Sequence, residues 1–189
     1  GTVVINEINY NSNNDHESGD WIELYNSGEM AIDISDWRLK DDDNNHIYNI
    51  PEETIIESED YLVIAQDLSQ FHEFYSTEIS TIGPFDFGFG GGGDQVRIYS
   101  SIMNIVDSVE YNVSAPWPSG ANNLGPSLEL INLEDNSLAE NWLASTNIGG
   151  TPGYMNNNVN LNVINHNNVL PNMIEVFQNY PNPFNPITN

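Results

Sequence analysis

Short segments of β-forming residues, separated by turn residues, recur along most of the chain and constrain its fold more than any other feature. Within these segments apolar and β-branched residues alternate with polar ones, and Gly, Asn and Asp gather between them. The expected strands are Thr2–Asn9, Trp21–Asn26, Ala31–Lys40, His46–Ile50, Tyr61–Ala65, Gln95–Ser100, Ile105–Tyr111 and Ser127–Ile131. Strands that recur about every 8–12 residues predict an all-β sandwich or barrel. Only Ser69–Ser76 and Ser137–Leu143 suit short helical turns.

The composition changes after Asn156, and we expect one β-domain over residues 1–156 followed by an extended tail. Residues 157–176 are rich in Asn and are expected to form a linker. Within them Val159–Ile164 alternates and also suits one added strand. Residues 177–189 contain three prolines, which forbid a helix and favour an extended backbone.

Acidic residues outnumber basic ones by 28 to 3, for a net charge of −25. A nucleic-acid binder gains affinity because Lys and Arg displace counterions, and basic clusters also attract anionic lipids. We therefore expect no nucleic-acid partner. We expect no membrane insertion either, since the sequence has no apolar run of about 18 residues. Cations, or a protein with basic patches, are the natural partners, and the alternative is charge that only keeps the protein soluble.

The sequence contains no recognisable catalytic motif, and we expect no catalytic activity. Cysteine is absent, which excludes disulfides, a thiolate metal site and a cysteine nucleophile. The glycine-rich run Gly88–Asp94 lacks the Lys and the following Ser or Thr of a phosphate-binding loop. A glycosidase needs two carboxylates that flank a cleft at a fixed separation, and a small sandwich rarely has one.

The turn at residues 41–45 is the best candidate for a cation site. Its oxygen-bearing side chains include Asp41, Asp42, Asp43 and Asn45, and calcium binds six to eight oxygens. We therefore consider calcium a possible cofactor here. The spacing lacks the Gly and the bidentate Glu of an EF-hand loop, and hairpin turns favour Asp and Asn for backbone reasons alone.

Two glutamates on expected strands are candidate ligand contacts. Strand alternation predicts Glu7 on the face opposite Asn6 and Ile8, and Trp21 and Glu23 on one shared face. Glu7 and Glu23 either accept hydrogen bonds from loop amides or contact a ligand.

Four aromatic side chains are expected to fill the core, and a fifth is a candidate ligand contact. Trp37 lies in an alternating segment, and Phe85, Phe87 and Phe89 alternate before the glycine run, so these four are expected inside. Trp117 stands between two prolines in a loop, and it is the tryptophan most suited to stack against a glycan.

The order and spacing of several short motifs resemble the bacterial lamin-tail domain over residues 2–156. The matching residues are Asn6-Glu7-Ile8, Trp21–Asn26, Asp33–Leu39, Gly93-Asp94, Asp107, Tyr111, Thr151-Pro152-Gly153 and Asn156. The resemblance implies an immunoglobulin-like β-sandwich, and the extended C-terminal tail follows it. It also implies a non-catalytic module of the kind that is often attached to secreted enzymes or surface proteins, and it makes Glu7 and Glu23 characteristic positions.

The tail resembles a second family. Asn179–Pro186, with the letters NYPNPFNP, is similar to the opening of the C-terminal sorting domain used by type IX secretion. We expect residues 177–189 to be the truncated start of that domain. The resemblance implies that the protein is secreted from a Gram-negative bacterium or held at its outer cell surface.

Three functions are compatible with these features. The first is a non-catalytic extracellular or cell-surface module with a structural or adhesive role and a protein partner. The second is a subunit of a self-assembling surface filament, in which the C-terminal tail adds as a strand to the sheet edge of a neighbour. The third is a calcium- or glycan-binding accessory domain of a larger secreted enzyme, which uses the acidic turn or Trp117.

Overall fold

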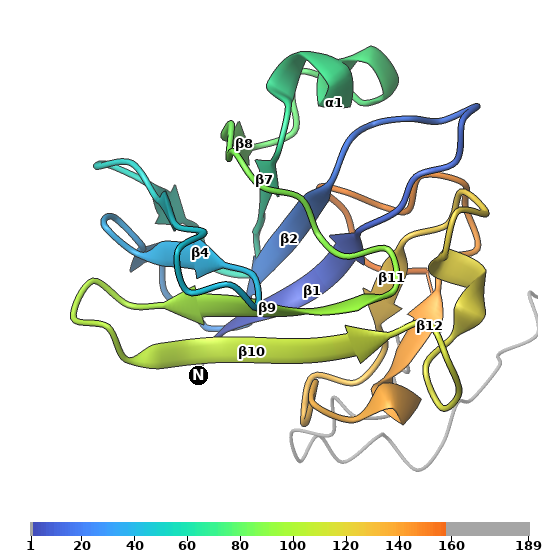
Figure 1. Ribbon diagram of the computed structural model, residues 1–189. Coiled ribbons are helices and arrows are strands. Elements are labelled where there is room, and N and C mark those ends of the chain that lie inside the picture. Colours follow the sequence, from blue (N-terminus) through green and yellow to red (C-terminus); the bar gives the residue numbers. More distant parts are fainter. Residues whose placement is uncertain (1, 158–189) are drawn as a thin grey trace, which may run out of the picture.

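Two β-sheets packed face to face form the body of the protein. The computed structural model describes residues 2–157 (Figure 1). One sheet has six strands in the order β12-β11-β1-β2-β7-β8, the other has four in the order β10-β9-β4-β5, and β3 pairs with β6 separately. This arrangement confirms the all-β, immunoglobulin-like β-sandwich expected from the sequence.

The described elements are short, and all of the strand pairs are antiparallel except β7 with β8. The strands are β1 Val3–Asn9, β2 Trp21–Asn26, β3 Ile32–Asp33, β4 Arg38–Lys40, β5 Tyr48–Asn49, β6 Ile55–Ile56, β7 Tyr61–Ala65, β8 Thr81–Ile82, β9 Gly93–Tyr99, β10 Ile105–Asn112, β11 Leu128–Leu130 and β12 Trp142–Ala144. The helices are α1 Leu68–Phe74 and the single 3₁₀ turns Ser119–Ala121 and Ala139–Asn141.

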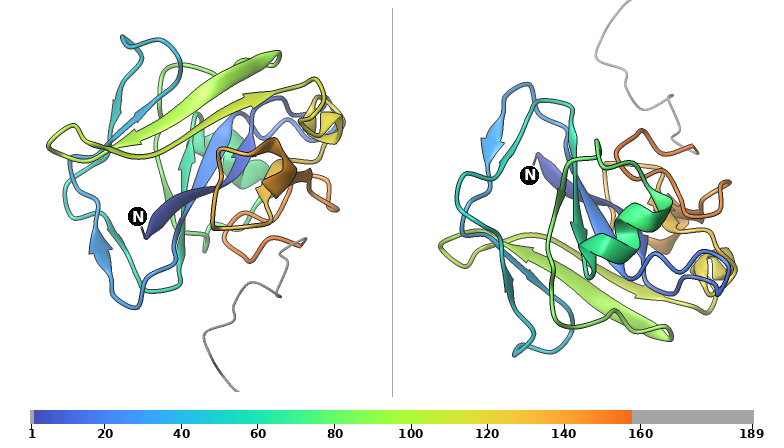
Figure 2. Two further views of the ribbon diagram at one scale, coloured as in Figure 1. Left: turned by 90° about the horizontal axis from the view of Figure 1, so that it is seen from below. Right: turned by 90° about the horizontal axis from the view of Figure 1, so that it is seen from above.

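The main core fills the space between the two sheets (Figure 2). Alternating residues such as Ile22 and Leu24 enter it from the six-stranded sheet, and Leu39, Val96 and Ile98 enter it from the four-stranded sheet. The three phenylalanines before the glycine run are also buried there, with ring centroids 4.8 to 6.1 Å apart, as predicted. The core therefore draws on both sheets and on the long connection from β8 to β9.

A second layer covers the outer face of the six-stranded sheet. Phe71 of α1 packs with Trp21, Val63 and Ala65 of β2 and β7, and all four side chains are fully buried. The side chain of Asp67 caps the helix by accepting hydrogen bonds from the amides of its first turn. This sheet thus has covered surface on both faces, whereas the four-stranded sheet is packed on one face.

The prediction of a single strand over Ala31–Lys40 was wrong. The chain turns between β3 and β4, where Asp36 adopts a left-handed backbone with φ of 61°. The Asp33 carboxylate accepts a hydrogen bond of 2.9 Å from the Ser35 amide and stabilises this turn. As a result Trp37 is only partly buried at the edge of the core, although the alternation predicted a core position.

Several strands were not predicted because they are very short. The two-residue strands β6 and β8 fall in segments without a recognisable alternation. The expected helical turn at Ser137–Leu143 is a 3₁₀ turn that leads directly into β12. Among the described residues, none of the helices has the length and apolar character needed to cross a bilayer. The predicted strand Val159–Ile164 and residues 177–189 lie outside the described residues.

Truncation of Trp142 tests whether the last strands belong to the same cooperative unit as the first. Trp142 of β12 is 1% exposed and packs in the main core, so Trp142→Ala should reduce the free energy of unfolding by about 3–5 kcal/mol. Its neighbour Leu143 is 42% exposed, and Leu143→Ala should change stability by less than about 0.5 kcal/mol. Denaturant unfolding followed by circular dichroism measures both. A second transition that alone responds to Trp142→Ala would contradict a single unit.

Candidate functional site

Three glutamates lie side by side in the middle of the six-stranded sheet. In the strand register Glu7 of β1 pairs with Glu23 of β2 on one side and with Glu129 of β11 on the other. All three side chains are fully buried. We call these three residues the glutamate row. The sequence analysis singled out Glu7 and Glu23 but missed Glu129, although its position between Leu128 and Leu130 repeats the same strand pattern.

Residues 145–157, which we call the closing segment, supply hydrogen-bond donors to the glutamate row. The Thr151 amide donates to Glu7 Oε1 at 3.0 Å, and the Gly153 amide donates to Glu23 Oε2. The Thr151 hydroxyl lies 3.0 Å from Glu129 Oε1. These contacts are the hydrogen bonds to loop amides that the sequence allowed for Glu7 and Glu23. They tie the closing segment to three strands at once.

Gly150 lies tightly against the Glu7 side chain in a left-handed backbone conformation that favours glycine. A Cβ atom there would lie 1.8 Å from Glu7 Oε1 and 2.3 Å from Ser127 Oγ, and the backbone φ is 75°. Any side chain would displace the carboxyl group or the segment itself. The sequence Gly150-Thr151-Pro152-Gly153 is thus shaped by its contact with the glutamate row.

The predicted placement of Asn6 opposite Glu7 was wrong. A β-bulge between Ile5 and Glu7 inserts one extra residue, so strict alternation fails at this point. The Asn6 amide Nδ2 donates to Glu23 Oε1 at 2.7 Å and to Asn156 Oδ1 at 3.0 Å. Asn156 in turn donates to the Leu130 carbonyl at 2.9 Å. The bulge therefore brings Asn6 into the hydrogen-bond network of the glutamate row.

Burial changes the titration of these carboxyl groups. Burial raises the pKa of Glu7 to about 8, and the hydrogen bonds from Ser127 and Thr151 counteract it only in part. Burial and the nearby charge of Glu7 raise the pKa of Glu23 well above its usual value. Burial also raises the pKa of Asp20 to about 7, although the Phe89 amide donates to this carboxyl at 2.7 Å.

The acidic side chains that lie together at the turn between β4 and β5 differ from the predicted set. Asp41 and Asp42 approach Asp94 of β9, and one carboxylate oxygen from each lies within 4.8 Å of the others. Asp43 is not part of this group, and its carboxylate accepts a hydrogen bond of 2.8 Å from the Asn45 amide. The sequence analysis missed Asp94, which only the pairing of β4 with β9 brings to the turn.

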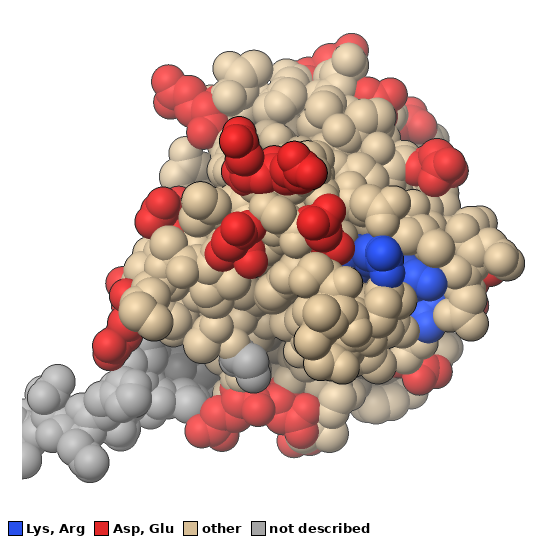
Figure 3. Space-filling view, turned by 90° about the vertical axis from the view of Figure 1, so that its left-hand side faces the viewer, with Lys and Arg blue, Asp and Glu red and all other residues tan. Residues whose placement is uncertain are grey.

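Two of the three basic residues of the chain, Lys40 and Arg97, help to build this same region. The Arg97 guanidinium donates to the Asp41 carbonyl at 2.8 Å and to Asn44 Oδ1 at 3.0 Å. Lys40 Nζ donates to the Asn44 carbonyl at 2.9 Å. Figure 3 shows the Lys and Arg side chains gathered in one strip of a surface on which acidic groups predominate. The side chains of Lys40 and Arg97 therefore stabilise the acidic turn.

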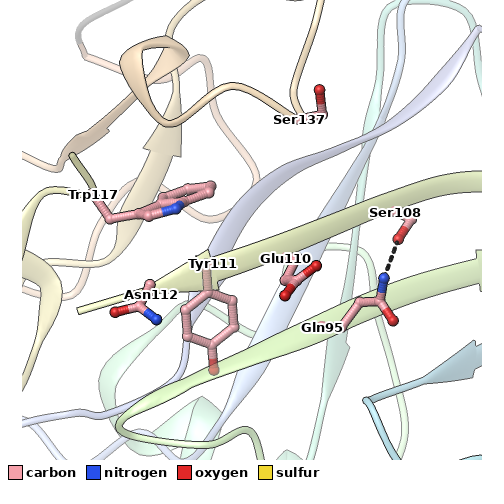
Figure 4. Close-up of a pocket in the computed structure, with 7 residues that line it drawn as sticks. All are labelled: Gln95, Ser108, Glu110, Tyr111, Asn112, Trp117 and Ser137. Carbon is pink, nitrogen blue, oxygen red and sulfur yellow. Dashed lines mark hydrogen bonds between the residues drawn. The ribbon is translucent and has the colours of Figure 1, made fainter. Parts of the chain in front are cut away.

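An open groove runs over the outer face of β9 and β10 toward the Trp117 loop. Its larger part has a volume of about 450 Å³ and is lined by Gln95, Ser108, Glu110, Tyr111, Asn112, Trp117 and Ser137 (Figure 4). A second part of about 300 Å³ shares four of these residues and reaches Asp42 and Asp94. We call this surface the Trp117 groove. It brings Trp117 close to groups that sequence reasoning did not connect with it.

The fold defines the class of this protein as an immunoglobulin-like β-sandwich, and its buried carboxyl groups are bonded within that fold. A match to a family model agrees with this fold. The chain belongs to the lamin tail domain family, which matches residues 1–113 and is generally non-enzymatic. A search of curated proteins finds no match to this chain. The family match ends just after β10, while β11 and β12 complete the six-stranded sheet beyond it.

The glutamate row makes stability depend on pH. The Glu7 carboxyl loses its proton near pH 4.5 in the unfolded chain but near pH 8 in the folded protein. Because the folded state binds more protons at Glu7 between these values, this group should make stability fall as pH rises from about 4.5 to about 8, and the raised pKa of Glu23 adds to the fall. Glu7→Gln should flatten this dependence, measured as the free energy of unfolding in denaturant at several pH values. Glu52→Gln, at an exposed position, is the control, and an unchanged slope in Glu7→Gln would contradict the assignment.

Proposed function

We propose that this protein is a non-catalytic interaction module that acts outside the cell, secreted from or held on the outer surface of a Gram-negative bacterium. Membership in the lamin tail domain family supports a structural or interaction role. The residues Asn179–Pro186, which resemble the start of a type IX sorting domain, support export. The partner we propose is a protein or a glycan.

One observation favours interaction over chemistry. The buried carboxyl groups Glu7 and Glu23, whose pKa values are raised, are of the kind that catalytic sites use, since perturbed acids often act in catalysis. Here they are fully enclosed, and their oxygens accept hydrogen bonds from Asn6 and the closing segment. A substrate cannot reach them without displacing part of the fold. Contacts with a partner must therefore use the outer surface.

The location can be tested on intact cells of the source bacterium. An antibody raised against this chain should label unpermeabilised cells or detect the protein in the culture medium, because a module of this function must meet its partner outside. An antibody against a cytoplasmic protein provides the control for leakage. Labelling that requires permeabilisation would contradict the proposal.

A self-assembling filament subunit is the second candidate function. The strand β10 has eight residues, and within residues 2–157 it pairs only with β9, so one of its edges offers a place for an added strand. That edge is partly closed, because the Asp107 carboxylate accepts hydrogen bonds of 2.6 Å from the Ile5 amide and from Asn136. The closure favours the single module.

Calcium at the acidic turn is a further part of this proposal. Asp41, Asp42 and Asp94 offer carboxylate oxygens close together, which is the ligand type that calcium prefers. Asp43 supplies a matched control because it lies in the same turn but outside the group. The same protein preparation can test assembly and calcium together.

Light scattering after size exclusion should give the mass of one chain, 21.2 kDa, in calcium and in chelator. Calcium should raise the melting temperature of the wild type, because it binds only the folded site. Asp42→Asn with Asp94→Asn should abolish this rise, and Asp43→Asn should preserve it. Larger assemblies would establish the filament candidate instead. A melting temperature that is indifferent to calcium in the wild type would remove calcium from the proposal.

A further inference from the structure

The Trp117 groove has the size of a small-molecule site, and its lining is mostly polar. Its larger part, about 450 Å³, lies in the range of about 300–1,000 Å³ that is typical of such sites. Two aromatic residues, Tyr111 and Trp117, line it together with several hydrogen-bonding side chains. The lining residues come from four separate parts of the chain: β9, β10, the loop that holds Trp117 and the loop that holds Ser137. Residues that are distant in the sequence come together in the fold to form this surface.

Trp117 is fixed in place while part of it faces the groove. Its ring packs against the buried Trp142 with centroids 6.2 Å apart, and the side chain is partly buried against the core. In Figure 4 the indole projects from its loop toward the side on which Glu110 and Ser137 lie. A held aromatic ring is a flat apolar platform that costs little conformational entropy when a ligand stacks on it.

The polar groups beside this platform are mostly neutral and include both donors and acceptors. Gln95 and Asn112 carry amides, Ser108 and Ser137 carry hydroxyls, and Glu110 is an exposed carboxylate. Gln95 Nε2 lies 3.4 Å from Ser108 Oγ, a long contact that a stronger partner can replace. Vicinal hydroxyls of a sugar donate and accept at once, so they match paired amides and hydroxyls together with one carboxylate acceptor.

We propose that the Trp117 groove is a binding site for a neutral saccharide, with Trp117 stacking on a sugar ring and Glu110, Gln95 and Asn112 bonding its hydroxyls. The net charge of −25 and the carboxylates of Glu110, Asp42 and Asp94 in the groove disfavour an acidic glycan. The Lys and Arg side chains of a basic peptide would need acceptors only, whereas amide and hydroxyl donors share this surface. The inference rests on the proposed function only in that such a glycan is met outside the cell.

The test uses the whole chain and a panel of defined probes. Cellohexaose, xylohexaose, mannohexaose and chitohexaose are titrated calorimetrically, with trigalacturonate and hexa-arginine as the acidic and basic alternatives. At least one neutral saccharide should bind. Trp117→Ala should weaken that binding at least about tenfold, and Trp117→Phe should keep most of it because the platform remains.

A pair of glutamates provides the control against loss of folding. Glu110→Ala should weaken saccharide binding several-fold, and Glu52→Ala, at an exposed position outside the groove, should not. Melting temperatures of all variants identify any that are unfolded. No binding of a neutral saccharide up to about 10 mM would overturn the site. So would binding that survives both Trp117→Ala and Glu110→Ala, or binding of hexa-arginine alone. Any of these results leaves the surface location, tested by antibody labelling, unaffected.

Discussion

The hydrogen bonds between the glutamate row and the closing segment are the interaction on which the rest of the structure depends. A carboxyl group buried in a sheet is costly unless donors reach it, and the strands themselves spend their amides on one another. The Thr151 and Gly153 amides meet that need for Glu7 and Glu23. Leaving such a group without its donors costs about 1–3 kcal/mol, so the segment and the row stabilise each other. This explains why a stretch with little regular structure is held against the sheet and why Gly150 has no room for a side chain.

Raised pKa values at the glutamate row have a structural origin. In many proteins a carboxyl group with a raised pKa is an acid or base in catalysis. The cause in this protein is enclosure by the fold, and a protonated carboxyl avoids the larger cost of burying a charge. The same reasoning holds for Asp20, whose carboxyl is bonded to the Phe89 amide and helps to place the phenylalanines of the core. These acids therefore relate to stability, and the residues that meet a partner belong to another part of the surface.

The sequence predicts the longer strands well because each has enough residues to show its alternation. The strands β1, β2 and β7 lie where the pattern places them, and the buried phenylalanines follow the same rule. The pattern fails at the bulge beside Asn6, where one extra residue moves the following side chains to the other face of the strand. It also fails at Asp36, where the chain turns although apolar and polar residues continue to alternate in the sequence. The two-residue strands β6 and β8 leave no recognisable pattern. Neither Glu129 beside Glu7 nor Asp94 beside Asp42 can be inferred locally, because pairings between distant strands create both neighbours.

The two sheets of the sandwich have different roles: the six-stranded sheet is covered on both faces, and the four-stranded sheet offers a surface for binding. The six-stranded sheet packs against the core on one face and against α1 and the closing segment on the other, so it offers little free surface near the glutamate row. The four-stranded sheet keeps an open outer face, and the Trp117 groove lies there. A strand added along β10 would compete with that groove, since Glu110 and Asn112 belong to both the strand and the groove lining. The bonds from Ile5 and Asn136 to Asp107 already cover this edge near the start of β10. The geometry of β10 therefore favours a ligand on its face over a neighbour at its edge.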